Sequence, residues 1–133
     1  MAGRVVPLPP AAVRRAVRTV LRGERRAAGI CVTFLGPIAM RRLNRRYKHR
    51  DRPTDVLAFS LSGPGGSLVG DVYVCRAVAA AEARARRIPL RTELLRLVVH
   101  GTLHVLVHDH PEGDGRERSA MWRRQERYLR RLG

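Results

Sequence analysis

An apolar stretch that contains four of the chain's five histidines constrains the fold more than any other feature. It reads VVHGTLHVLVHDH, residues 98–110, and it continues an apolar segment that begins at Leu90. The pattern predicts a long apolar helix over residues 90–106. Pro89 precedes this segment, and the polar loop PEGDG (111–115) follows it. Two of the histidines, His100 and His104, therefore fall inside a helix.

The spacing of these histidines indicates a metal site. His100 and His104 are four residues apart, which places both rings on one helix face, where both can bind one ion. His108 would lie about 12 Å along the axis from His100 if the helix continued, whereas the ligands of a zinc ion lie only about 2 Å from it. A third ligand must therefore follow a turn of the chain, which favours His110, with His108 as the alternative.

The ligand set favours catalysis over a purely structural role. Three neutral imidazoles with an open fourth position are typical of catalytic zinc, which lowers the pKa of its bound water and stabilises developing negative charge. The spacing His-x3-His-x5-His also occurs in the metzincin peptidases, where a glutamate general base follows the first histidine. Here Gly101 takes that position, so a peptidase with that mechanism is disfavoured.

The net charge indicates a polyanionic partner. The 133 residues contain 27 Lys and Arg against 11 Asp and Glu, for a formal charge of +16, which favours RNA or DNA. Lys48 is the single lysine among them; the preference for Arg fits a GC-rich genome, but the excess of positive charge does not follow from it. Several of the six aromatic residues are predicted to be core residues, which leaves few surfaces for base stacking.

The cysteines and the first residues indicate the compartment. Cys31 and Cys75 lie in apolar stretches and are predicted to be buried thiols without a disulfide. The opening MAGRVVPLPP lacks the apolar run of a signal peptide, and no segment approaches a membrane span. We therefore expect a cytoplasmic protein.

Hydrophobic periodicity predicts the first half of the chain. A helix begins at Pro9-Pro10 and closes at Gly29, and the apolar run 30–35 is a strand, predicted to be central in its sheet. A short helix follows from Pro37, and residues 44–53 are predicted to be a polar, basic loop. The inward residues predicted for these two helices are Val13, Val17, Val20 and Leu21, and Ile38, Met40 and Leu43.

The second half predicts a hairpin and three helices. Strands 54–61 and 68–75 are joined by the turn SGPGGS (62–67). Helices follow over residues 76–87 and 90–106, and a final helix has a basic stripe opposite an apolar side made of Met121, Trp122, Gln125, Leu129 and Leu132. Residues 1–133 are thus predicted to form a single small α+β domain, a mixed sheet packed with helices.

Three motifs resemble those of the YbeY-type endoribonucleases, also described as rRNA maturation factors. The motif HGTLHVLVHDH (100–110) is similar to the family's His-Gly-x-Leu-His-Leu-x-Gly-Tyr-Asp-His. LNRRYKHRDRPTDVLAF (43–59) is similar to the family's Leu-Asn-x2-Tyr-Arg-x2-Asp-x-Pro-Thr-Asp-Val-Leu-Ser-Phe, and GDVYVC (70–75) matches a Gly-Asp pair followed by an apolar strand. The motifs occur in the family's order and extend from about Gly29 to the end of the chain.

The resemblance implies a metal-dependent endoribonuclease whose zinc site, on a helix, is similar to that of metzincin-like metalloenzymes. One Zn²⁺ per chain would be bound by His100, His104 and His110. The implied activity is cleavage of single-stranded RNA in 16S rRNA 3′-end maturation and ribosome quality control. The implied partners are small-subunit rRNA and the small ribosomal subunit with its proteins, with neither membrane nor DNA expected. The alternatives are a zinc metallopeptidase and a non-catalytic rRNA-binding assembly factor with a structural zinc.

The chain departs from the family pattern at two places. Val107 and His108 replace the family's Gly-Tyr, and we expect the turn there to persist, with His108 adopting the positive φ that Val tolerates poorly. Lys48 stands where the family has Arg. We predict that Lys48 is a catalytic residue, a point charge beside the metal-bound water that holds the scissile phosphate. Arg50 and Arg52 are the next candidates for that role.

Overall fold

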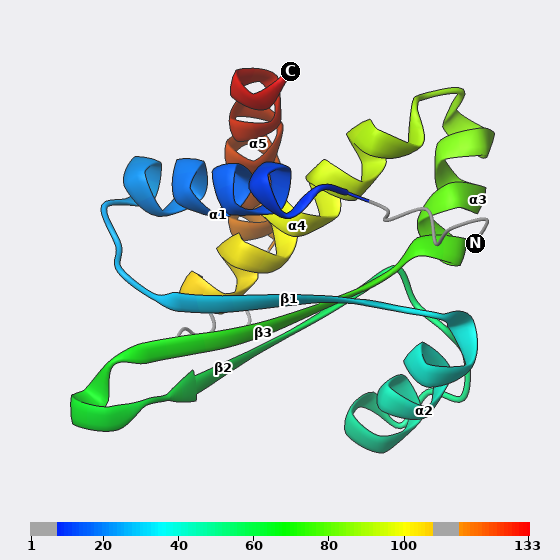
Figure 1. Ribbon diagram of the computed structural model, residues 1–133, viewed down its shortest axis with the longest axis horizontal. Coiled ribbons are helices and arrows are strands. Elements are labelled where there is room, and N and C mark those ends of the chain that lie inside the picture. Colours follow the sequence, from blue (N-terminus) through cyan, green and yellow to red (C-terminus); the bar gives the residue numbers. More distant parts are fainter. Residues whose placement is uncertain (1–7, 108–114) are drawn as a thin grey trace.

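The structure, a computed structural model, describes residues 8–107 and 115–133, in which helices pack on both faces of a small sheet (Figure 1). In chain order the elements are α1 (Pro10–Glu24), β1 (Gly29–Leu35), α2 (Pro37–Lys48), β2 (Val56–Ser62), the short 3-10 helix η1 (Pro64–Gly66), β3 (Leu68–Cys75), α3 (Arg76–Arg86), α4 (Leu90–Val107) and α5 (Gly115–Leu132). The predicted α+β class with a mixed sheet is confirmed. Within the described residues no helix is both long and apolar enough to span a membrane.

The sheet has the order β1-β3-β2, with β1 parallel and β2 antiparallel to β3. The predicted hairpin is therefore confirmed, but the prediction that strand 30–35 is central is wrong, since β3 is the central strand. Side chains alternate along β1: Ile30 and Val32 contact the main core, whereas Cys31 and Thr33 are exposed. The prediction of a buried thiol fails at Cys31 for this reason and is confirmed at Cys75.

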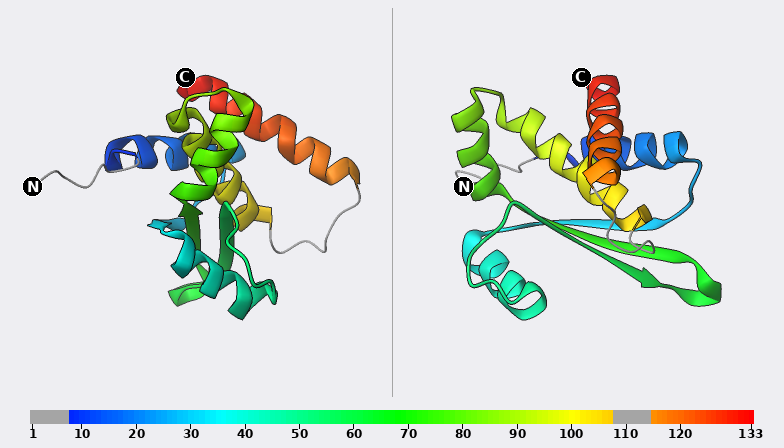
Figure 2. Two further views of the ribbon diagram at one scale, coloured as in Figure 1. Left: turned by 90° about the vertical axis from the view of Figure 1, so that its right-hand side faces the viewer. Right: turned by 180° about the vertical axis from the view of Figure 1, so that it is seen from behind.

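The two faces of the sheet are covered unequally. One face, which we call the inner face, is covered by α1, α4 and α5, and the other, the outer face, is covered at one end by α2 (Figures 1 and 2). The main core lies on the inner face, and a second, smaller core of Met40, Leu57 and Cys75 lies beneath α2. The fully or almost fully buried residues that α4 adds to the main core are Leu94, Leu95, Leu97, Val98, Val99, Leu103, Val105 and Leu106.

The helix α2 is longer than predicted, and the predicted loop over 44–53 is wrong in its first half. Met40 and Asn44 are buried one turn apart, so helical spacing continues through this charged segment. Asn44 donates its Nδ2–H to the Arg52 carbonyl at 2.8 Å, and His49 ends the helix in a left-handed conformation. Ile38, predicted to face inward, is 70% exposed. The many arginines on the solvent-facing side of α2 made this segment resemble a polar loop, although Met40 and Asn44 on its other side are buried.

Two glycines set how closely α4 lies on the sheet. Gly101 of α4 and Gly70 of β3 are both buried. A Cβ atom at position 101 would overlap Val72, and one at position 70 would overlap Val105. Residues 101 and 105 lie one turn apart on α4, and residues 70 and 72 share the inner face, so each glycine accommodates a valine of the opposite element. These two contacts fix the distance between α4 and β3, and with it the positions of His100 and His104 above the sheet.

The last helix is fixed to the first through Glu24. Its carboxylate accepts hydrogen bonds from the Tyr128 hydroxyl at 2.5 Å and from Arg124 Nη1 at 2.7 Å. Burial, followed by the hydrogen bond and charge of Glu24, raises the pKa of Tyr128 to about 12. The hydroxyl therefore remains protonated and able to donate. These contacts hold α5 beside α1, which matters because α5 contributes Gln125 to the site described below.

Candidate metal centre

The structure brings His100 and His104 together on α4. Both side chains are half-buried, their ring centroids lie 6.2 Å apart, and their planes are inclined by 44°. With zinc–nitrogen bonds of about 2.1 Å, two imidazoles on one ion have centroids about 5 to 6 Å apart. The observed separation is slightly longer than this, so a small movement of the rings would bring both to one ion, as the sequence predicts for two ligands on one helix face.

Gln125 holds the His100 ring in one orientation. The Nδ1 atom of His100 lies 2.6 Å from Gln125 Oε1, while Gln125 Nε2 donates to the Glu126 carboxylate at 3.0 Å. The second bond fixes which end of the amide faces the ring, because a carboxylate accepts from the amide nitrogen. The oxygen can only accept, so His100 carries its proton on Nδ1. The Nε2 lone pair is thereby left available to a metal ion.

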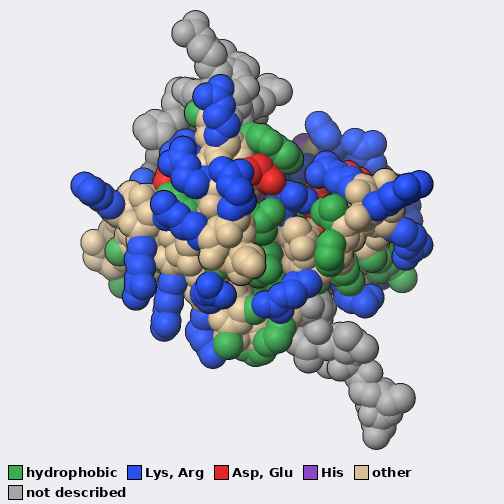
Figure 3. Space-filling model, turned by 90° about the horizontal axis from the view of Figure 1, so that it is seen from above, with side chains coloured by type: hydrophobic (Ala, Val, Ile, Leu, Met, Phe, Trp, Pro, Cys, Tyr) green, Lys and Arg blue, Asp and Glu red, His purple; other side chains and the backbone are tan. Residues whose placement is uncertain are grey.

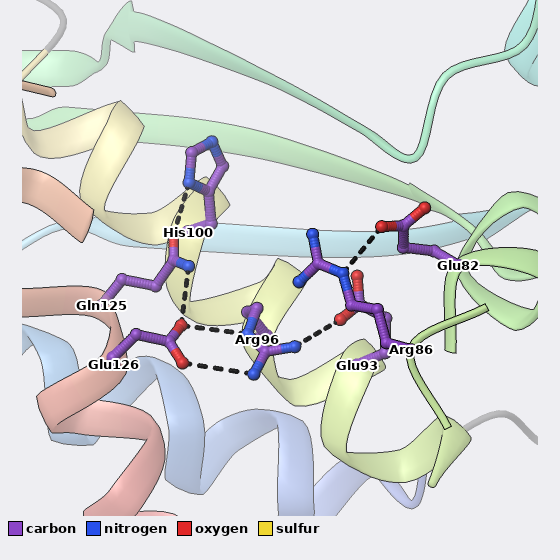
Figure 4. Close-up of polar contacts among 7 residues, drawn as sticks. All are labelled: Glu82, Arg86, Glu93, Arg96, His100, Gln125 and Glu126. Carbon is purple, nitrogen blue, oxygen red and sulfur yellow. Dashed lines mark hydrogen bonds and ion pairs between the residues drawn. The ribbon is translucent and has the colours of Figure 1, made fainter. Parts of the chain in front are cut away.

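Behind Gln125 the polar contacts continue along α4 and α5 (Figure 4). Glu126 accepts from Arg96 Nε at 2.9 Å and Nη2 at 3.2 Å, and Arg96 Nη1 donates to Glu93 at 2.6 Å. Burial opposes ionisation of Glu126, but the hydrogen bonds from Arg96 and Gln125 outweigh it and hold the pKa of this carboxyl below its usual range. The fixed carboxylate in turn fixes the Gln125 amide and, through it, His100.

Sequence reasoning missed this support for His100. It placed Gln125 on the inward side of the last helix, where it is 1% exposed, but gave it no role. Glu93, Arg96 and His100 follow one another at intervals of three and four residues, which places them on one helix face. That spacing was the available signal. Trp122, predicted to share the inward side with Gln125, is 49% exposed.

The third ligand lies outside the described residues, as do the alternative His108 and the turn predicted there. Among residues 8–107 and 115–133 no cluster of three side chains suited to a metal occurs. The last turn of α4, which precedes His108, is held by two hydrogen bonds. Ser60 Oγ donates to the Val105 carbonyl at 3.1 Å, and Arg26 Nη1 donates to the Leu106 carbonyl at 3.2 Å. These bonds satisfy carbonyls that the end of a helix leaves unpaired.

The structure does not bring Lys48 to the histidine pair. Lys48 is the last residue of α2, and its Nζ lies 5.8 Å from the ring centroid of Phe59. Phe59 packs with the second core on the outer face, whereas α4 packs on the inner face. The sheet therefore separates Lys48 from His100 and His104. Arg50 and Arg52 are exposed in the segment that follows α2.

Comparisons with known proteins agree with the motifs. The sequence profile of the family described as Endoribonuclease YbeY matches residues 8–133. A curated relative, the Endoribonuclease YbeY of Chlorobium luteolum, is 36% identical over 126 residues, covering 94% of this chain and 90% of the relative. The solution structure of TM1509 from Thermotoga maritima superposes with a TM-score of 0.66 at 27% identity, covering 92% of this chain and 79% of that one. On the family match over residues 8–133 and the 36% identity to this curated relative, the chain belongs to the YbeY endoribonuclease family.

Proposed function

We propose that this endoribonuclease is zinc-dependent and cleaves single-stranded RNA, with one Zn²⁺ bound by His100, His104 and His110. The observation that carries the proposal is the His100 ring, whose Nδ1–H is held by Gln125 so that Nε2 is available beside His104. A metal-binding histidine usually donates its other ring N–H to a hydrogen-bond acceptor in this way. His108 remains the alternative third ligand.

The chain's own residues divide the work of catalysis. When bound, zinc supplies a water of lowered pKa and positive charge for the transition state. Gln125 orients His100, and the Glu126–Arg96–Glu93 contacts prevent the amide from rotating. The excess of arginine attracts the phosphate backbone. Lys48, placed across the sheet from the histidines, is better suited to hold the RNA strand than to contact the metal-bound water.

The buried position of Gly101 weighs against the peptidase alternative. A metzincin peptidase needs a glutamate at this position as its general base. Even a single Cβ atom here would overlap Val72, so a glutamate would require α4 to move away from the sheet. The packing at Gly101 therefore supports a function that does not use a glutamate base at this position.

The biological setting is proposed from the family and the charge. We propose 16S rRNA 3′-end maturation and ribosome quality control as the processes served, with the small ribosomal subunit and its proteins as partners and the cytoplasm as the compartment. Family membership supports RNA as the substrate, and the formal charge of +16 fits it. The non-catalytic assembly factor with a structural zinc remains the second candidate.

Removal of the metal tests the proposed function. Elemental analysis is expected to find one zinc per chain. Chelation is expected to abolish cleavage of ribosomal particles that carry unprocessed 16S rRNA, and of a single-stranded RNA oligonucleotide. Added zinc should restore both activities, because the core of the fold is made by apolar side chains and should persist on chelation. Circular dichroism should change little on chelation.

Each alternative gives a different result in this experiment. An assembly factor with a structural zinc would lose its fold or its RNA binding on chelation and would cleave no RNA before it. A peptidase would lose proteolysis instead. Cleavage that continues at the full rate in protein shown to be metal-free would refute zinc dependence.

Replacement of Gln125 tests the support for His100. Gln125→Leu removes the acceptor of the Nδ1–H bond while roughly preserving volume, so the ring loses its fixed tautomer and orientation. We expect zinc affinity to fall about 10- to 100-fold, measured by competition with a chromophoric chelator. Thr102→Val is the matched control, because it also deletes a buried side-chain hydrogen bond on α4, in this case to the Val98 carbonyl and not to a histidine. Equal losses in the two variants would show a general loosening of α4 instead.

A further inference from the structure

Three aromatic side chains form a row on the outer face of the sheet. Tyr47 lies in the last turn of α2, Phe59 on β2 and Tyr73 on β3. The ring centroids of Tyr47 and Phe59 are 5.2 Å apart, and those of Phe59 and Tyr73 are 6.0 Å apart. The planes are inclined by 59° and 67°. We call Tyr47, Phe59 and Tyr73 the aromatic row.

The aromatic row borders an open part of the sheet. Among the described elements α2 is the helix on the outer face, and it covers one end of that face (Figures 1 and 2). Beyond it Cys31 and Thr33 of β1 are exposed, and Leu61 of β2 is 55% exposed. Tyr47 itself is 51% exposed. Tyr47 is therefore not one of the core aromatic residues, and part of its side chain is accessible to a ligand.

Cations lie over two of the three rings in the aromatic row. The Arg46 guanidinium carbon is 5.4 Å from the centroid of Tyr47, and Lys48 Nζ is 5.8 Å from that of Phe59. The exposed Arg41 is already paired, with both of its hydrogen bonds, at 2.8 and 3.0 Å, on Asp51, whereas no carboxylate contact is found for Arg46 or Lys48 in the described part of the chain. These two cations are therefore available to phosphate groups.

One carboxylate on this face limits where a phosphate backbone can run. Asp71 is half-buried on β3, opposite Phe59 of β2 and Cys31 of β1. Burial, followed by the charge of Asp71, raises the pKa of Tyr73, so the phenol remains neutral beside it. The negative charge disfavours phosphates above β3 and leaves the α2 side, with Arg46 and Lys48, for the backbone.

Charge alone does not distinguish this face. Figure 3, which looks down on the helices of the inner side, shows Lys and Arg side chains spread widely over that face as well. What distinguishes the outer face is a row of aromatic rings, of which Tyr47 is exposed and Phe59 and Tyr73 are half-buried, with cations beside it. Stacking rings combined with cations bind single-stranded nucleic acids without reading their sequence. Aromatic side chains can stack on the unpaired bases of single-stranded RNA. In a duplex the bases are stacked on one another and are not accessible to such side chains.

The position of β2 connects this face with the histidines. β2 is an edge strand. Its Ser60 hydrogen-bonds α4 at Val105 on the inner face, and the adjacent Phe59 lies on the outer face. A strand of RNA that leaves the aromatic row has to cross only this edge to approach α4.

We propose that the aromatic row is a base-stacking surface for the single-stranded RNA substrate, with Arg46 and Lys48 on its phosphates. The inference rests on the proposed function and assigns part of the chain's RNA specificity to the sheet, away from the metal. It also gives Lys48 a role that agrees with its place on α2.

Replacement of Tyr47 tests the stacking. Tyr47→Ala is expected to raise the Kd for a single-stranded RNA oligonucleotide about tenfold, the effect of losing one stacked base. KM should rise by a similar factor, with kcat and zinc content unchanged. An oligonucleotide containing 2-aminopurine should lose the quenching of its fluorescence on binding. Tyr47→Trp should restore affinity and quenching. Ile38→Ala, at an exposed apolar residue of the same helix, is the matched control and should behave as the wild type.

Salt dependence separates the rings from the cations. Tyr47→Ala should weaken binding by the same factor at every salt concentration, because stacking releases no counterions. Arg46→Gln should lower the slope of log K against log salt by about 0.7, the value for one phosphate contact with a single strand. Arg18→Gln, which removes one exposed charge from α1, should leave this slope unchanged.

The outcomes also separate this inference from the proposed function. If the wild type cleaves RNA and Tyr47→Ala keeps its Kd, KM and quenching, the stacking surface is refuted while the function stands. If the wild type neither binds nor cleaves single-stranded RNA, the function itself fails. If Tyr47→Ala instead dissociates a dimer in analytical ultracentrifugation with RNA binding unchanged, the face is an interface between copies and the inference is wrong.

Discussion

The replacement His104→Ala is expected to abolish RNA cleavage, with kcat/KM lowered at least about a hundredfold, or roughly 2.7 kcal/mol in the activation free energy. The variant removes one of the three proposed imidazole ligands. The two that remain do not hold zinc in a catalytic geometry, because a catalytic zinc needs three protein ligands. Elemental analysis should show the zinc lost together with activity. The fold should persist, because the main core of α4 is made by its leucines and valines.

The fifth histidine provides the control for this variant. His49 is exposed at the end of α2 in a left-handed conformation, which Asn also tolerates. His49→Asn should therefore keep one zinc per chain. A His104→Ala protein that retains a full equivalent of tightly bound zinc would show that the site is wrong. Comparing His108→Ala with His110→Ala then identifies the third ligand, because only the ligand's replacement should release the metal.

The sequence predicted the helix that carries His100 and His104 and the hairpin on which it packs. The helix over 90–106 is confirmed as α4, one residue longer, because an apolar segment bounded by Pro89 and a polar loop has few alternatives. The pairing of His100 with His104 also follows, since helical spacing alone brings them together. The hairpin of β2 and β3 is confirmed for a similar reason, because two apolar strands flank a glycine-rich turn.

The errors arose where tertiary packing decides the outcome. Strand 30–35 is apolar almost throughout, yet β1 is an edge strand, because the order of strands depends on long-range pairing that composition does not report. The charged segment after Leu43 continues α2 because Asn44 is buried and bonded to Arg52, a contact that local polarity obscures. Lys48 and the two histidines lie on opposite faces of the sheet because α2 and α4 pack on opposite faces. The sequence alone does not show on which face each helix packs.

The support for His100 was hidden for a different reason. Gln125 lies 25 residues from His100 along the chain, on another helix, and a glutamine on an apolar side carries no motif. Its role depends on Glu24 holding α5 in place through Tyr128 and Arg124. A single sequence does not reveal such a partner unless the packing of the helices is known.

Gly101→Ala is expected to destabilise the protein, although alanine is the better helix former. In a helix interior the exchange gains up to about 1 kcal/mol in propensity. The new methyl group would overlap Val72, which is completely buried on the central strand, and overpacking of a core costs about 1–3 kcal/mol. The overlap is direct and the strand is held on both sides, so we expect the upper part of that range and a net loss of about 2 kcal/mol. For a chain of this size the melting temperature should fall by roughly 5–10 °C.

A double-mutant cycle attributes this loss to the contact between α4 and β3. Val72→Ala removes the two methyl groups that the new Cβ meets, so the double variant Gly101→Ala/Val72→Ala should be more stable than the sum of the single changes predicts, by about 1–2 kcal/mol. Gly29→Ala is the control, because a Cβ there meets no atom within 4 Å, and it should melt with the wild type. Cleavage by Gly101→Ala should also fall, since His100 and His104 move when α4 is lifted from the sheet. A Gly101→Ala protein as stable and active as the wild type would show that α4 does not lie this close to β3, and with it the steric argument against a glutamate base at position 101 would fail.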